Sequence, residues 1–331
     1  MPIMNHTIKT AAIGASLAMS LFLSGCNFNS AASRMSTEDL AVQGENEPLK
    51  VLYAGNLQSE KMFCFMMVNN MQQIDNLATK HGDAMTGANL TAFLEPGNNE
   101  LMALVAPADM YEGGRVHRDN GTCTISAWGA SPEGEKTELT SIKVTVEEKT
   151  PTAKHSKLYD SKHRSPLSDP DGSFKGYGAR FRRNLYVHTI PVWRWTQAPK
   201  FEPTKENMQQ LQAAYTDLLT LLREKDFAGL EAAWSLSSRE KSIAEGHQMS
   251  PHSIFKQIGF EDDFHFAEDA EIMEPRAWDE YKLKYYAGGR LVRLEDKGEA
   301  SPLRIGSDLK NRQISYTPYF AFIQGRLVVA R

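Results

Sequence analysis

The sequence predicts a two-domain protein in which an N-terminal β-sandwich is followed by an α+β domain, with helices packed on a curved antiparallel sheet. Three observations lead to this fold class. At 331 residues the chain is long enough for two domains of about 150 residues each. Short strand-like runs fill residues 49–150, whereas amphipathic helical spacing begins after residue 201. The composition, with 41% hydrophobic and 24% charged residues, is that of a globular protein.

Residues 1–25 are predicted to be an export signal rather than part of a fold. A polar start that ends at Lys9 precedes an apolar run at 10–23, and these 14 residues are fewer than the roughly 20 that a membrane-spanning helix needs. The run ends in Leu23-Ser24-Gly25-Cys26, which resembles the lipobox of bacterial lipoproteins. This resemblance implies that Cys26 is acylated and anchors the mature lipoprotein to a membrane. An ordinary secretory signal with an incidental cysteine is the alternative.

The residue after Cys26 and the two remaining cysteines indicate the compartment. In lipoproteins of two-membrane bacteria an Asp after the cysteine retains the protein at the inner membrane, and Asn27 takes that place here. We therefore expect the outer membrane, with the protein on its periplasmic face. Cys64 and Cys123 form one candidate pair in an oxidising compartment, which favours a disulfide. Two buried free thiols are the alternative.

Residues 26–48 lack hydrophobic periodicity and are rich in Ser, Asn, Ala and Glu, so they are predicted to form a flexible tether. The β-sandwich domain is predicted at 49–150, with its clearest alternation at 141–146 and a hairpin turn at 96–99. Cysteines on separate strands would join its two sheets. The predicted strands are Leu49–Tyr53, Met62–Val68, Leu90–Leu94, Glu100–Ala106, Gly121–Trp128 and Glu138–Glu147.

Residues 151–200 are predicted to be a basic loop and the inter-domain connection. Between residues 154 and 183 there are eight Lys or Arg against three Asp or Glu, in a chain whose formal net charge is −4. This segment is a candidate surface for an acidic partner or for anionic lipid head groups, and a solvated loop is the alternative. Aromatic residues at 192–195 are predicted to pack between the domains. The candidate partner-binding residues are Arg164, Lys175, Arg180, Arg182 and Arg183.

Residues 201–331 begin with helical patterns and end with strand patterns, which is the order of an α+β domain. Ser237 with Glu240 resembles a capping box, so a short helix through Trp234 is expected to end before a further helix begins. Helix starts are predicted at Pro203-Thr204, Phe227, Ser237 and Ser250-Pro251. Strands are predicted at 281–286, 290–294, 314–323 and 327–330.

Two patterns in this half carry a resemblance to a fold family. LLREKDFAGLEAAW at 221–234 and YFAFIQGRLVVAR at 319–331 resemble the cone-shaped domains related to nuclear transport factor 2. The resemblance covers roughly residues 204–331 and implies a helical layer lying in a curved sheet. It implies no function, because that superfamily includes enzymes, binding modules and inert partners.

The search for catalytic motifs leads us to predict no catalytic, cofactor-binding or metal-binding residue, and therefore no enzyme. GxSxG, HExxH, P-loop and GxGxxG motifs do not occur in the mature chain. Asp169-Pro170-Asp171-Gly172 lacks the further ligands of a calcium loop and is interpreted as a turn. The acidic residues around His265 are interpreted as a solvated face. His265 with Asp269 is the best candidate catalytic pair, although a structural role is favoured.

These observations favour a lipid-anchored, periplasm-facing binding protein without catalytic activity. Its most specific form is an immunity protein that neutralises an antibacterial effector of type VI secretion, which would make a secreted toxin the protein partner. The alternatives are an envelope enzyme or small-molecule or glycan-binding protein that uses the cone cavity, and an accessory subunit of an envelope assembly. Nucleic acid is not an expected partner, because 37 Lys and Arg face 41 Asp and Glu.

The lipid anchor is directly testable. Cys26→Ala is expected to abolish metabolic labelling with a fatty acid and to move the protein from the membrane fraction to the soluble fraction, because acyl chains bury about 0.8 kcal/mol per CH₂ group in the bilayer. Labelling and detergent partitioning of the wild type and the variant provide the measurement. An unchanged membrane fraction for Cys26→Ala would contradict the anchor.

Overall fold

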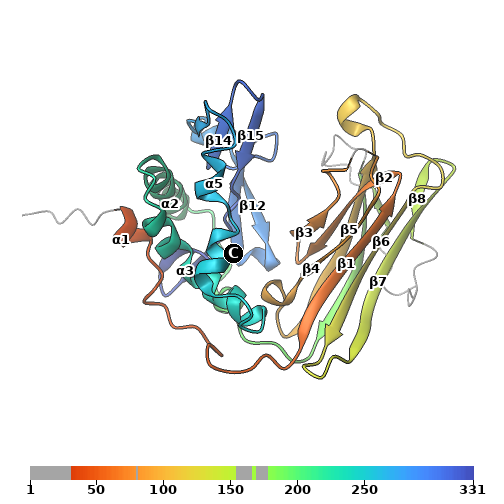
Figure 1. The fold of residues 1–331 in the computed structure, drawn as a ribbon, viewed down its shortest axis with the longest axis horizontal. Helices are drawn as coiled ribbons and strands as arrows, with labels where there is room; N and C mark the ends of the chain where they lie inside the picture. Colours follow the sequence, from red (N-terminus) through yellow and green to blue (C-terminus); the bar gives the residue numbers. More distant parts are fainter. Residues whose placement is uncertain (1–30, 80, 154–165, 169–177) are drawn as a thin grey trace, which may run out of the picture.

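The computed structural model describes residues 31–79, 81–153, 166–168 and 178–331. Four antiparallel sheets make up most of its regular structure, and helices are confined mainly to one side (Figure 1). We call residues 52–187 the first half and residues 205–331 the second half. The first half contains two five-stranded sheets, and the second half places four helices beside two smaller sheets.

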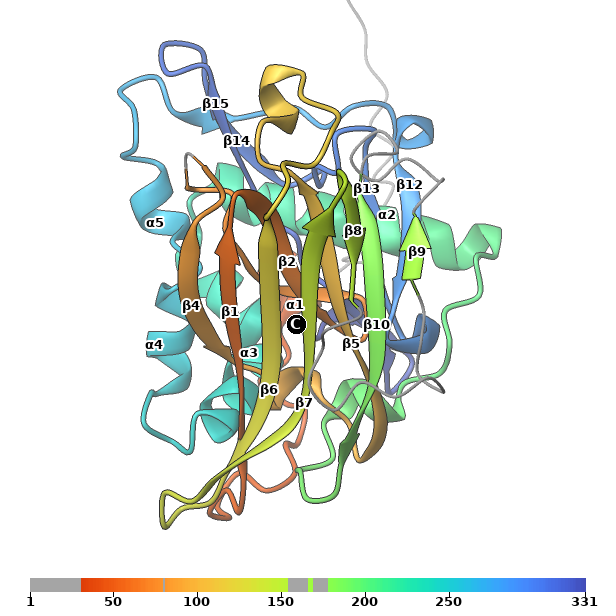
Figure 2. The same ribbon diagram turned by 90° about the vertical axis from the view of Figure 1, so that its right-hand side faces the viewer.

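The first half is all sheet, as the sequence predicts. Sheet A has the order β4-β1-β6-β7-β8, and sheet B has the order β3-β2-β5-β10-β9 (Figures 1 and 2). In sheet A the strands are β1 (Leu52–Glu60), β4 (Ala84–Asn89), β6 (Thr122–Ala130), β7 (Lys136–Glu147) and β8 (Thr150–Thr152). In sheet B they are β2 (Met62–Val68), β3 (Met71–Asp75), β5 (Gly97–Pro107), β9 (Pro166–Ser168) and β10 (Ala179–Val187).

Alternating side chains hold the two sheets of the first half together. Every second residue of β6 is buried, from Cys123 through Ile125 and Ala127, and β10 alternates in the same way. Since successive side chains of a strand point to opposite faces, this pattern fills one apolar core between the sheets. The outer face of sheet B is left for contact with the second half (Figure 1).

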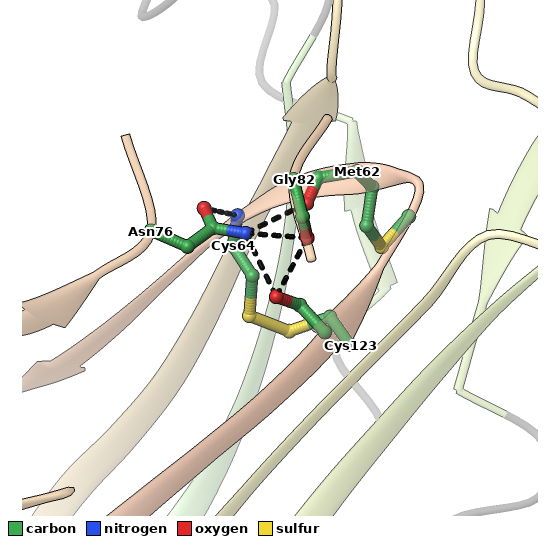
Figure 3. Close-up of a disulfide and its surroundings, with 6 residues drawn as sticks. Met62, Cys64, Asn76, Gly82 and Cys123 are labelled. Atoms are coloured by element: carbon green, nitrogen blue, oxygen red, sulfur yellow. Dashed lines mark hydrogen bonds between the residues drawn. A yellow bond between two sulfur atoms is a disulfide. The ribbon is translucent and has the colours of Figure 1, made fainter. Parts of the chain in front are cut away.

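The disulfide prediction is confirmed: Cys64 of β2 is bonded to Cys123 of β6, so the bridge joins sheet B to sheet A (Figure 3). Asn76 holds this corner in place. Its Oδ1 accepts the Cys64 backbone N–H at 2.8 Å, and its Nδ2 donates to the carbonyls of Met62 and Gly82 at 2.9 and 2.8 Å. Because these groups are buried, the Asn76 amide satisfies backbone atoms that water cannot reach.

Two sequence predictions for the first half are wrong. The predicted strand Leu90–Leu94 is the 3₁₀ helix η1 (Thr91–Phe93), and the predicted turn at 96–99 lies largely within β5. The predicted domain limit at residue 150 is also too early, because β10 pairs with β5 along nine residues and completes sheet B. The three arginines within 180–183 favour a solvated loop, whereas the apolar residues that alternate along the same segment indicate a strand.

The predicted flexible tether is wrong for residues 31–41, which pack against the second half. Helix α1 (Ala31–Met35) contacts the long helices, and Met35 and Leu40 are buried. The Thr37 hydroxyl accepts the backbone N–H of Leu236 at 2.9 Å, and the Arg239 guanidinium donates to the carbonyls of Thr37 and Leu40. Single buried residues in a polar segment make these contacts, and they leave no periodic signal in the sequence.

The second half begins with helices and continues with short strands. Thr204 caps the first helix, since its hydroxyl accepts the Asn207 backbone N–H at 3.2 Å, and Ser250 caps a later one. The helices are α2 (Lys205–Arg223), α3 (Phe227–Ala244), α4 (Pro251–Lys256) and α5 (Phe260–Asp263). The strands are β11 (Glu271–Ile272), β12 (Lys282–Tyr286), β13 (Leu291–Glu295), β14 (Arg304–Ser307), β15 (Arg312–Ser315), β16 (Phe320–Ile323) and β17 (Arg326–Val329).

Helix α3 differs from the sequence prediction of two helices. It runs without a break from Phe227 to Ala244, so the Ser237/Glu240 pair is not a capping box. Glu240 is instead buried and turned toward the first half. Within the described part of the chain, no helix has both the length and the apolar character needed to cross a bilayer.

Removal of the disulfide is expected to destabilise the first half. The bridge closes a segment with a sequence separation of 59, and the chain-entropy model assigns about 4 kcal/mol to a loop of this size. The free energy of unfolding of Cys64→Ala/Cys123→Ala, measured by urea denaturation followed by circular dichroism, should fall by roughly this amount. Reduced wild-type protein is the matched control and should lose a similar amount. Unchanged stability of both proteins would contradict this role.

Candidate functional site

The predicted basic patch does not form one surface among the described residues. Arg164 and Lys175 lie outside the described residues, as do Cys26 and Asp169-Pro170-Asp171-Gly172. Arg180 and Arg182 lie on the outer face of β10, toward the second half. Arg183 points the other way: it is only 7% exposed, and its Nη1 donates to the Ser141 carbonyl at 2.6 Å. The expectation that Arg183 belongs to an exposed patch is therefore wrong, because strand alternation turns it into the sandwich.

The two residues of the candidate catalytic pair, His265 and Asp269, lie in different environments. Asp269 accepts hydrogen bonds from the Ser307 hydroxyl at 2.5 Å and from the Leu309 backbone N–H at 2.9 Å, and these bonds lower the pKa of its carboxyl group. It thereby fixes the turn that follows β14. His265 is exposed to solvent. Among the described residues no group of three or more His, Cys, Asp or Glu side chains is arranged to hold a metal ion.

Contacts across the boundary between the halves converge on η1, as the sequence prediction for 192–195 anticipates. Trp195 lies in the 3₁₀ helix η5 (Arg194–Gln197), and Trp193 lies just before it. Both side chains are fully buried. Their indole N–H groups donate to the carbonyls of Thr91 and Ala92 at 3.0 and 3.3 Å. The Thr91 carbonyl also accepts the Leu94 backbone N–H at 3.4 Å, so the indole supplies a second donor at this buried helix end. The aromatic segment therefore packs between the halves and satisfies the backbone of η1.

A buried ion pair adjoins these contacts. We call the contacts of Trp193, Trp195, Arg331 and Glu240 around η1 the lock. The Arg331 Nη1 donates to the Glu240 carboxylate at 2.5 Å, and the two side chains are 0% and 1% exposed. The Arg331 Nε also donates to the Ala92 carbonyl at 2.8 Å, while its guanidinium lies over the rings of Trp193 and Trp195 at 5.6 and 5.7 Å. Burial lowers the pKa of Arg331, and Glu240 opposes that shift. Glu240 thus joins α3 to η1 through Arg331.

An ion pair that does join the two halves lies at the Glu95 loop. The Arg290 guanidinium donates to both carboxylate oxygens of Glu95 at 2.6 Å, and it also lies 5.6 Å from the centre of the Trp195 ring. The Ala287 backbone N–H donates to the Asn69 carbonyl at 3.0 Å. The two halves are therefore held together at several points around η1 rather than by a single connection.

Beyond this lock the halves enclose two adjoining hollows. The first, of about 270 Å³, lies between the outer face of sheet B and strands β12 and β13. The second, of about 510 Å³, lies between β3 and the segment 315–319. Gln72, Arg293 and Glu299 line both, so the hollows form one cleft. We call this the interlobe cleft. A separate hollow of about 430 Å³ lies between residues 43–50 and 189–192 and has both polar and apolar walls.

Charged side chains line the interlobe cleft from both sides. Arg180 and Arg182 come from β10, and Lys284 and Arg293 come from β12 and β13. Lys284 and Arg293 are directly opposite each other in the β12/β13 register. Since like charges in such a cross-strand position repel, this pair opposes the stability of the sheet. An anion in the cleft would relieve that repulsion.

Arg293 has a carboxylate partner on the same wall. Its guanidinium contacts Glu295, which is buried and also accepts the Tyr286 hydroxyl at 2.7 Å. The same guanidinium lies 4.9 Å from the ring centres of Tyr286 and Tyr319. Burial raises the pKa of Tyr286, so its hydroxyl remains a donor. This arrangement fixes the direction of Arg293.

Two further carboxylates lie near the cations of the cleft, and only Glu299 lines it. Glu100 lies beside Arg182, with 3.4 Å between the Arg182 Nε and a carboxylate oxygen, and burial raises the pKa of Glu100 against the effect of that arginine. Glu299, on the loop after β13, interacts electrostatically with Arg180, Lys284 and Arg293. Cations of both halves therefore surround one carboxylate.

The second hollow also contains a cation. Lys241 of α3 lines it, with its ammonium 5.7 Å from the centre of the Phe93 ring. Burial and the nearby Arg331 lower the pKa of Lys241 to about 8. Its charge is thus sensitive to any anion that enters, since an anion favours the protonated form.

Sequence reasoning found Arg180 and Arg182 but missed the opposite wall. Lys284, Arg293 and Glu295 alternate with apolar residues along two predicted strands. Such alternation is typical of a hairpin with one polar face, and a polar face of this kind indicates contact with solvent. Only the packing of the second half on sheet B turns this face into a wall.

Comparisons with known proteins give no relative for this chain: no family model, no curated protein and no solved structure matches it. The resemblance to cone-shaped domains and to lipoproteins therefore stays a prediction, and the function is argued from the site alone.

Loss of the Glu240 charge is expected to loosen the lock. Glu240→Gln keeps the shape of the side chain but leaves Arg331 as a buried cation without its counter-ion, which typically costs about 3–5 kcal/mol of folding free energy. Asp39→Asn is the matched control, because Asp39 forms an exposed pair with Arg326 at 2.9 Å, where less than about 1 kcal/mol is at stake. Urea unfolding of both variants measures the difference. Equal losses would contradict the role of the buried pair.

Proposed function

We propose that this protein is a lipid-anchored binding protein of the bacterial envelope, without catalytic activity, that holds its ligand in the interlobe cleft. The observation that carries the proposal is the arrangement of the cleft itself. Two folded halves are locked around η1, and next to this lock both contribute charged and aromatic side chains to one hollow region. Ligand sites are commonly concave, lie between structural units and combine apolar walls with a few oriented polar groups.

The fixed geometry of the cleft supports its role as a ligand-binding site. Arg293 is oriented by Glu295 and two tyrosine rings, so its guanidinium loses little freedom when a ligand arrives. The Glu95–Arg290 pair and the hydrogen bond from Arg331 to the Ala92 carbonyl join the two walls. A preorganised site of this kind spends less binding free energy on ordering its own side chains.

The anchor would place the second half near the membrane. Ala31 begins helix α1, which contacts α2 and α3. Five residue steps separate it from Cys26, a length that reaches at most about 18 Å when fully extended. With acylation at Cys26, the outer membrane would therefore lie close to the helical side of the molecule. The sandwich and the cleft would then lie farther from the bilayer (Figure 1).

The finer architectural proposal concerns residues 201–331, for which we propose an α+β domain with a cone-like sheet. Its support is a shared apolar core that contains Leu218 and Leu222 of α2, Trp234 of α3, and Val292 and Phe320 of the sheet. The immunity function and the toxin partner stay predictions from the sequence. Of the basic residues in the predicted partner surface, the three that the structure describes are divided between the cleft and the sandwich interior.

The proposal is tested by filling the cleft. Gln72 is exposed on edge strand β3 and lines both hollows, so Gln72→Trp is expected to occupy the cleft with little effect on the core. Gln58→Trp is the matched control on an exposed position of β1 in the other sheet. Native mass spectrometry of the Cys26→Ala protein isolated without detergent should show a bound small molecule in the parent and in Gln58→Trp.

Gln72→Trp should lose at least about nine-tenths of that occupancy, which corresponds to a tenfold or greater weakening. Equal occupancy in Gln72→Trp and Gln58→Trp would contradict the cleft as the binding site. Absence of a bound molecule from the parent protein, isolated from its native envelope, would also contradict the proposal.

A further inference from the structure

The interlobe cleft also indicates the chemistry of its ligand, an inference that rests on the proposed function. We propose that the cleft binds an amphipathic anion, that is, a single hydrocarbon chain attached to a carboxylate or phosphate group. The argument depends on the charge of the cleft, on the repulsion between its cations, on the carboxylate that now lies among them and on the apolar wall beside them.

The charge of the cleft is opposite to that of the whole chain. The chain has a formal net charge of −4. The two hollows together are lined by six Arg or Lys side chains and only two Glu side chains. Glu100 and Glu240, which pair with Arg182 and Arg331, lower this excess but leave two positive charges. A concave surface of one sign with low-dielectric walls concentrates ions of the other sign.

The cations are placed where they repel one another. Lys284 is directly opposite Arg293 across β12 and β13, and Arg180 and Arg182 are two residues apart on the same face of β10. The first pair lies on one wall and the second pair on the facing wall. Like charges in a cross-strand position repel, and Glu295 and Glu299 offset only part of the positive charge of these four side chains. A bound anion between the walls would turn this repulsion into attraction on both sides.

Glu299 shows where such an anion would lie. Its carboxylate interacts electrostatically with Arg180 from the first half and with Lys284 and Arg293 from the second half. The residue is exposed, on the loop between β13 and β14, so its side chain is free to move aside. Because Glu299 lines the same hollow as these cations, its carboxylate would compete with an anionic ligand for them.

The wall beside these cations is apolar. Phe65, Met67, Met102 and Leu104 project from the outer face of sheet B into the first hollow. The second hollow adds rings of Phe93, Trp234 and Tyr316. Burial of the CH₂ groups of a hydrocarbon chain on such a surface favours binding. A small inorganic anion would leave this surface unused, whereas a neutral lipid would leave the cations without a counter-ion.

Binding of defined probes tests the inference. Oleate and lysophosphatidylglycerol supply the carboxylate and phosphate forms of the same amphipathic chemistry, monoolein supplies the chain without charge, and inorganic phosphate supplies charge without a chain. Isothermal titration of the Cys26→Ala protein below the critical micelle concentrations should give saturable 1:1 binding of at least one of the first two. Monoolein and inorganic phosphate should each bind at least about tenfold more weakly.

Three variants locate the anion. Arg180→Gln/Arg182→Gln should weaken binding of the anionic lipid by about tenfold or more, because charge-assisted hydrogen bonds are lost. Glu299→Gln should strengthen it several-fold, because the internal competitor loses its charge. Arg223→Gln is the control, since Arg223 pairs with Glu274 on the exposed end of α2, away from the cleft, and its Kd should equal that of the parent.

The outcomes separate this inference from the proposed function. Equal affinity for monoolein and oleate, equal affinity for inorganic phosphate and oleate, or no saturable binding of either anionic lipid would overturn the amphipathic anion. The cleft would still be a binding site if Gln72→Trp lost its native ligand. Retention of the native ligand by Gln72→Trp would instead remove the proposed function, and this inference with it.

Discussion

The buried ion pair between Glu240 and Arg331 fixes the guanidinium through which the second half contacts η1 of the first half. A charge without a partner in a dry interface costs several kcal/mol, so each side chain requires the other. Arg331 simultaneously donates to the Ala92 carbonyl and lies over two tryptophan rings. Helix α3, η5 and η1 must therefore come together at one place. This geometrical demand positions sheet B opposite β12 and β13, and thereby creates the cleft.

Such a lock specifies geometry more than it adds stability. Apolar residues of the same volume often replace a buried ion pair without loss of stability, but they seldom fix one orientation. At this interface the backbone carbonyls of Thr91 and Ala92 accept hydrogen bonds from Trp193, Trp195 and Arg331. A rotated second half would lose the hydrogen bond from Arg331 to the Ala92 carbonyl. The walls of the cleft are thus held in register by hydrogen-bond requirements as well as by packing.

The elements that the sequence predicted well are those whose signals are local. Strand β2 coincides with the predicted Met62–Val68, and Thr204 and Ser250 cap the predicted helices, because alternation and capping depend on near neighbours. The pairing of Cys64 with Cys123 followed from cysteine number. Glu240 was misread as part of a capping box because its partner, Arg331, lies 91 residues away. Thr37 was assigned to a tether for the same reason, since Leu236 and Arg239 hold it from another part of the chain.

The candidate site was only half visible in the sequence, and the reason is physical. Arg180 and Arg182 lie in a conspicuous basic segment, whereas Lys284 and Arg293 are single polar residues on an ordinary hairpin. Charge counts along the chain cannot show that the outer face of sheet B lies opposite β12 and β13, because buried contacts around η1 bring these elements together. Strand alternation places Arg183 on the opposite side of β10 from Arg180 and Arg182, which a charge count also cannot show. A charged cleft of this kind is therefore a product of tertiary structure, in which surfaces that would separately be solvated become the two walls of one site.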